Sequence, residues 1–149
     1  MQLIAKIDEK IKEAMRAQQK DALLALRNIK AFLKNKIIDL RRDLDASEEM
    51  QALATMCKQR QESIDSYQKA NREDLVAKEK FELSIIQQFM PEPLSEEQLV
   101  SLISEVISEV DANGPQDMGK VMQALKPKVT GRADGKVVSQ KVKEVLSAP

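Results

Sequence analysis

The chain has 149 residues, a formal net charge of zero from 24 basic and 24 acidic side chains, and only 3% aromatic residues. Zero net charge gives no global electrostatic reason to bind nucleic acid. The absence of His excludes histidine-based metal sites and bases, and a single cysteine excludes an intramolecular disulfide. A chain poor in Gly and aromatics and rich in Leu, Ala, Lys, Glu and Gln predicts an all-α fold.

Two helices are expected first, over residues 3–18 and about 22–41, with Asp21 as the N-cap of the second. Helical spacing assigns each an apolar stripe: Ile4, Ile7, Ile11 and Met15, then Leu26, Ile29, Leu33, Ile37 and Leu40. Four bases share a neighbouring face of the second helix: Arg27, Lys30, Lys34 and Arg41.

A third helix is expected from a cap at Asp45 with Glu48, or at Ser47 alone, to about residue 69. Arg60 interrupts its apolar stripe, and the bases of this region are interpreted as partners of acids on their own helix. Asn71 ends that helix or caps a fourth one, about 72–90. These elements predict an antiparallel hairpin or bundle of about four helices.

Pro91 and Pro93 force an extended segment, so we place a domain boundary there, giving an N-terminal helical domain at 1–93 and a small C-terminal three-helix domain at 94–149. Ser95 and Gln98 form a capping box that opens the second part. Its helices are expected at about 95–110, 117–126 and 134–147, with a proline-broken turn after the second.

Charge is unevenly distributed in the second part. Residues 94–114 hold five acids and no base, whereas residues 115–149 hold seven bases against three acids. A glycine-punctuated loop lies in the basic stretch, and backbone N–H groups at a helix start, flanked by bases, suit a phosphate. The candidate residues are Lys120, Lys128, Gly131, Arg132, Gly135 and Lys136. The alternative is that the glycines only form the turn and the bases are solvated.

Several blocks carry a family resemblance: DMGKVM at 117–122, TGRADGKVV at 130–138, RNIKA at 27–31, KQRQESI at 58–64, NREDL at 71–75 and FMPEPLS at 89–95. In these blocks and their spacing the chain resembles the GatB/YqeY family, specifically the stand-alone YqeY-like proteins. Asn71 stands where the family pattern often has Gly, and Asn tolerates the same left-handed conformation.

The resemblance implies an all-α fold and kinship with the C-terminal region of the GatB component of the aspartyl/glutamyl-tRNA amidotransferase. That region helps to hold the tRNA body, whereas the chemistry lies in a catalytic domain that this chain has no room for. We therefore expect a non-catalytic accessory protein without cofactor or metal, binding tRNA or another RNA through phosphate and shape. Arg27, Lys30 and Lys34 form a second, weaker candidate site.

Two other functions stay open. A helical protein–protein adaptor would dock a partner through the N-terminal helices. A carbon–nitrogen ligase with glutamine as amide donor would release ammonia from glutamine. No stretch approaches the roughly 18 apolar residues of a membrane helix, and the start lacks a signal-peptide core. We therefore expect no membrane association and a cytoplasmic location.

Overall fold

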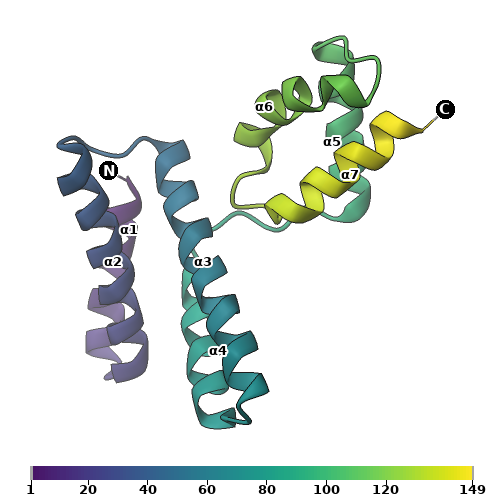
Figure 1. The fold of residues 1–149 in the computed structure, drawn as a ribbon. Coiled ribbons are helices and arrows are strands. Elements are labelled where there is room, and N and C mark those ends of the chain that lie inside the picture. The colour runs from purple at the N-terminus through teal and green to yellow at the C-terminus, as the bar shows by residue number, and fades with distance from the viewer. Residues whose placement is uncertain (1, 149) are drawn as a thin grey trace. The chain divides into compact units, whose positions relative to one another are not determined.

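A computed structural model describes residues 2–148 of the chain. These residues form seven α-helices and one short 3-10 helix, with no strand among them, which confirms the all-α prediction (Figure 1). The chain divides into two compact units, Met1–Pro91 and Glu92–Pro149. Each unit has its own hydrophobic core.

The first unit contains the helices α1 (Gln2–Arg16), α2 (Lys20–Leu40), α3 (Ala46–Lys69) and α4 (Glu73–Gln87). α1 packs against α2 and α3 packs against α4, and α2 also contacts α3 and α4 (Figure 1). The four helices are therefore joined through α2. Side chains that are almost wholly shielded from solvent fill this core, among them Ile7, Ile29, Leu33 and Leu53.

Two residues assigned to the apolar stripes of the first unit are exposed. Met15 is 55% exposed and Leu40 is 45% exposed. Both lie in the last turn of their helices. Ala14, instead of Met15, is buried near the end of α1. The helical period was right, but it does not reveal how far the neighbouring element extends.

The helix ends of the first unit follow local sequence signals in two of three cases. Asp45 and Glu48 form the predicted reciprocal capping box at the start of α3. Asn71 has φ 57° after α3, the left-handed conformation expected of it. The predicted Asp21 cap is wrong, because α2 begins at Lys20 and Asp21 lies inside its first turn, where an acid favours the helix dipole.

The second unit contains α5 (Glu96–Glu109), a 3-10 helix η1 (Pro115–Asp117), α6 (Met118–Val129) and α7 (Gly135–Ser147). α5, α6 and α7 each pack against the other two. The buried residues of its core are all aliphatic, among them Ile103, Val106, Val121, Leu125 and Val142. Ser95 and Gln98 form the predicted capping box of α5.

The helix before the glycine loop is longer than predicted. Pro127 was expected to break it after residue 126, yet α6 continues to Val129. A proline this close to the end removes one backbone donor from the last turn, and that turn is still closed by the amide of Thr130, which donates to the carbonyl of Lys126 at 3.1 Å. Among the described residues, no helix is both long and apolar enough to cross a membrane.

Candidate nucleic-acid interface

The connection between α6 and α7 is a tight, internally bonded turn. Gly131 has φ 80°, a region that residues with a Cβ rarely adopt. The amides of Arg132 and Ala133 both donate to the carbonyl of Val129, at 2.9 and 3.1 Å. The amide of Leu94 donates to the carbonyl of Arg132 at 2.8 Å, which ties the turn to the segment before α5. Gly131 is therefore explained by the turn itself.

The start of α7 already has an anionic partner from the chain. The carboxylate of Asp134 accepts the backbone N–H of Lys136 at 2.8 Å, an N-cap interaction. Gly135 is the first residue of α7, and open space surrounds the place where its Cβ would be. A phosphate at this helix start would therefore face the Asp134 carboxylate, which argues against the cradle expected from the glycines.

Two of the predicted phosphate ligands are engaged within the unit. The ammonium of Lys128 lies 3.2 Å from a carboxylate oxygen of Glu109 on α5. The Nε of Arg132 donates to the carbonyl of Glu92 at 3.3 Å. Both side chains keep part of their surface in solvent, but Lys128 has a carboxylate that compensates its charge. The loop residues therefore do not form one free basic cluster.

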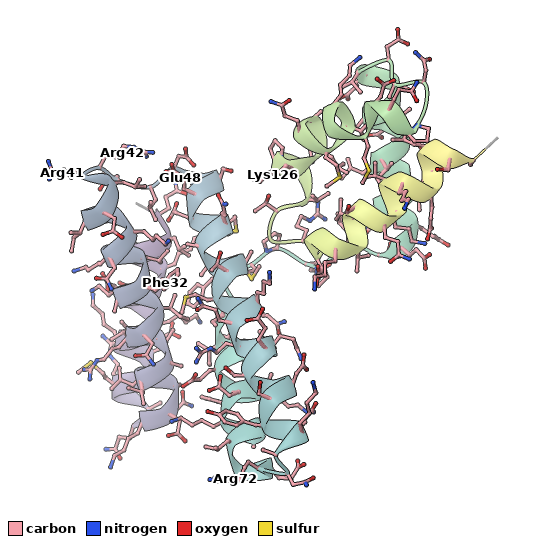
Figure 2. The ribbon with its side chains drawn as sticks, viewed as in Figure 1. Phe32, Arg41, Arg42, Glu48, Arg72 and Lys126 are labelled. Atoms are coloured by element: carbon pink, nitrogen blue, oxygen red, sulfur yellow. The ribbon has the colours of Figure 1, made fainter. Side chains whose placement is uncertain are left out.

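Other bases of the second unit are exposed and have no carboxylate within ion-pair distance among residues 2–148. Lys120 and Lys136 belong to the predicted set, whereas Lys126 and Lys143 were not chosen from the sequence. Figure 2 labels Lys126 on α6, ahead of the turn. Lys143 follows Lys136 by seven residues on α7, so both lie on the same side of that helix. The seven-residue spacing was the signal that could have identified Lys143.

The remaining lysine of α7 is held by acids. Lys141 lies 2.5 Å from Glu96 and 3.4 Å from Glu144. Its hydrogen bond with Glu96 lowers the pKa of that carboxyl and raises the pKa of the Lys141 ammonium. α7 thus carries one neutralised lysine and two free ones, which makes it a suitable element for controlled substitutions.

The second predicted site, on α2, is divided by the fold. Lys30 lies 2.5 Å from Asp8 of α1, so its charge is compensated. Arg41 leaves the helix in a left-handed conformation with φ 57°. Figure 2 labels it at the end of α2, beside Arg42. Arg27 and Lys34 stay on the helix, exposed to solvent, with no ion pair in the described part of the chain.

Contrary to the prediction, the bases of α3 do not all pair along their own helix. Arg60 reaches across to α4, where its Nη1 donates to Glu82 at 2.8 Å and lies 3.2 Å from Glu79. Both carboxylate side chains are only 13% exposed. Arg60 thus occupies the gap in the apolar stripe of α3 and links the two helices.

At the α2–α3 connection, a bidentate pair shifts the titration of one carboxyl. Arg42 donates two hydrogen bonds to Glu48, at 2.9 and 2.6 Å (both residues are labelled in Figure 2). These bonds, with the backbone N–H of Asp45, lower the pKa of Glu48 from its ordinary 4.5 to about 2. Arg42 is therefore occupied in a local structural role.

Comparison with known proteins identifies the family. The chain matches the family described as "Yqey-like protein" over residues 4–146. The chain belongs to the YqeY family. This confirms the resemblance carried by the sequence blocks.

The chain is also similar to curated relatives named "Altered inheritance of mitochondria protein 41, mitochondrial". It is 28% identical to the Pyrenophora tritici-repentis protein over 98% of this chain and 82% of the relative. It is 34% identical to the Saccharomyces cerevisiae protein over 79% of this chain and 57% of the relative. The Eremothecium gossypii protein is 36% identical over 58% of this chain and 48% of the relative. The matches thus span most of the first relative and about half of the other two.

The comparisons correct one expectation and support another. The predicted cytoplasmic location is contradicted, because these relatives are named as mitochondrial proteins. That prediction rested only on missing targeting signals, and a missing signal does not specify a destination. The family match and the observed helices support the expectation of a helical, YqeY-like protein.

Proposed function

We propose that this YqeY-family protein binds the sugar–phosphate backbone of RNA, tRNA being the first candidate, without catalysing a reaction. The observation that supports the proposal is the separation of charge in the second unit. Lys120, Lys126, Lys136 and Lys143 are exposed without a carboxylate partner among the described residues, whereas α5 carries no base. Exposed, uncompensated bases are the side chains that release counterions from phosphates.

The paired bases provide the test of this proposal, because neutralised lysines contribute less to phosphate binding than free ones. A double substitution Lys136→Ala/Lys143→Ala removes two free charges from α7. Lys128→Ala/Lys141→Ala removes two charges that Glu109 and Glu96 already compensate. Both variants change the net charge equally, so they separate local contacts from the overall electrostatic field of the protein.

The experiment measures the affinity of the full chain for bulk tRNA across a salt series. Each phosphate contact contributes about 0.7–0.9 to the slope of log K against log salt. The first variant should therefore reduce the slope by about 1.4–1.8, with a loss of affinity at low salt, and the second should leave the slope nearly unchanged. Absence of binding at low salt, or equal effects of the two variants, would contradict the proposal.

From the resemblance to the amidotransferase, this proposal takes only the binding of RNA. The region that the chain resembles is the tRNA-holding tail of that enzyme, so the enzyme's reaction is not extended to this protein. With 3% aromatic residues, few side chains can stack on unpaired bases, so we expect binding that tolerates different sequences.

A further inference from the structure

The outward face of α2 carries a row of apolar residues at a spacing of seven. Leu24, Ala31 and Ile38 are all exposed, and Leu24 and Ile38 are exposed by 50% and 69%. Seven residues turn an α-helix by about 20° less than two full turns, so the three side chains lie in one line about 21 Å long. We call Leu24, Ala31 and Ile38 the outer seam of α2.

The outer seam lies opposite the face that builds the core. The buried residues of α2 are Ala25, Leu26, Ile29 and Leu33. They pack against the neighbouring helices of the first unit, and none belongs to the outer seam. Folding of the unit therefore gives no reason for large aliphatic side chains at 24 and 38, where a solvated helix face would ordinarily carry polar residues.

Basic and acidic residues lie on opposite sides of the seam. Arg27 and Lys34 flank it, about 40–60° around the helix from its centre. Asn28 and Asn35 flank it on the other side. The two acids of α2, Asp21 and Asp39, lie beyond the asparagines, about 80° from the centre of the seam. The face thus combines an apolar line with one basic edge.

We propose that the outer seam of α2 docks an acidic amphipathic helix of a partner protein. An apolar row at seven-residue spacing supplies one of the two apolar positions per heptad that a helix pair uses, and the flanking charges determine which partner helix can lie along α2. Arg27 and Lys34 specify acids on the partner's facing edge. The partner segment needs just over two heptads, about 15 residues, to span the seam, with aliphatic residues toward Leu24 and Ile38.

The same features argue against three other occupants. In an antiparallel two-fold contact with a second copy of the chain, Arg27 and Lys34 would face the same bases, and in a parallel one they would face the asparagine edge, so neither arrangement supplies acids to the basic edge. RNA would pair with the bases but would leave Leu24 and Ile38 without an apolar partner. A lipid surface would require Asn28 and Asn35 to enter the acyl region beside a seam whose middle residue is only Ala31.

The test uses the full chain and two synthetic helical peptides of about three heptads. Both peptides carry the same leucine seam, and one has glutamate and the other lysine at the flanking positions. Three variants are compared with the wild type: Ile38→Ser, Arg27→Glu/Lys34→Glu, and Lys58→Glu/Lys78→Glu. The last is the matched control, since Lys58 and Lys78 are exposed bases of α3 and α4 and the change in net charge is identical.

The proposal predicts saturable binding of the acidic peptide, at least about tenfold tighter than that of the basic peptide. Ile38→Ser should weaken binding of the acidic peptide by about tenfold. Arg27→Glu/Lys34→Glu should make the basic peptide bind more tightly than the acidic one, whereas the control variant should still prefer the acidic peptide. No saturable binding, or binding that Ile38→Ser leaves unchanged, would overturn the proposal. Binding of bulk tRNA or anionic phosphatidylserine vesicles that depends on Ile38 would also overturn it, in favour of RNA or a lipid surface.

Discussion

Replacing Val142 by alanine should destabilise the second unit, whereas the same substitution at Val137 should not. Both valines lie on α7. Val142 is completely buried, and Val137 is 49% exposed. The two substitutions remove the same atoms from the same helix, so the difference between them measures burial alone.

The magnitude follows from the size of the unit and the chemistry of the change. Loss of the two γ-methyl groups of a buried valine, with the cavity they leave, costs about 2 kcal/mol. At Val137 the higher helix propensity of alanine should give a change between zero and a gain of about 0.5 kcal/mol. A unit spanning Glu92–Pro149 has a total stability of roughly 3–9 kcal/mol, so Val142→Ala removes a large part of it.

Amide hydrogen exchange, followed by mass spectrometry, distinguishes the two units. The slowest amides of α5, α6 and α7 should exchange about 30-fold faster in Val142→Ala, the factor that corresponds to 2 kcal/mol. Val137→Ala should leave them unchanged or slightly slower. Because the cores of the two units consist of different residues, amides of α1–α4 should be unaffected in both variants. Equal acceleration by both substitutions would refute the assignment of Val142 to the core.

Three further predictions concern single interactions. Gly131→Ala should lower stability by about 1–2 kcal/mol in thermal unfolding, because φ 80° is strained for alanine. Arg60→Met should cost about 1–3 kcal/mol in urea unfolding, because it leaves two largely buried carboxylates of α4 without their cation. No change in the urea midpoint would contradict the interhelical link. The pKa of Glu48 is lowered to about 2 by Arg42, so its stabilisation is present above pH 4.5 and lost as the pH falls toward 2. The urea midpoint of the wild type should therefore fall more steeply through that range than that of Glu48→Gln, and parallel curves would contradict this.

Signals that depend on neighbouring residues were readable from the sequence. The capping boxes at Asp45 and Ser95 formed as predicted, because each joins groups three residues apart. Asn71 adopts the left-handed conformation for the same local reason. The helical class and family membership also followed from composition and from short blocks of sequence.

Partners far apart in the chain were not predictable in this way. The sequence around Lys128 does not indicate that Glu109, 19 residues earlier, lies beside it. The sequence around Arg60 likewise does not indicate that Arg60 pairs with acids of α4 and not with acids of its own helix. Which bases are free, and which are compensated, depends on how helices pack. The proposed roles of Lys136 and Lys143 rest on that distinction.

The sequence by itself thus determined the helices, the capping boxes at Asp45 and Ser95, and the family, because turns, caps and apolar periodicity are short-range properties of the chain. Only the tertiary structure decided that Met15 and Leu40 are exposed, that Lys30 and Lys128 are neutralised, and that the outer seam of α2 has no partner within its own unit. Exposure and charge compensation depend on which elements meet, and that is set by the packing of whole helices against one another.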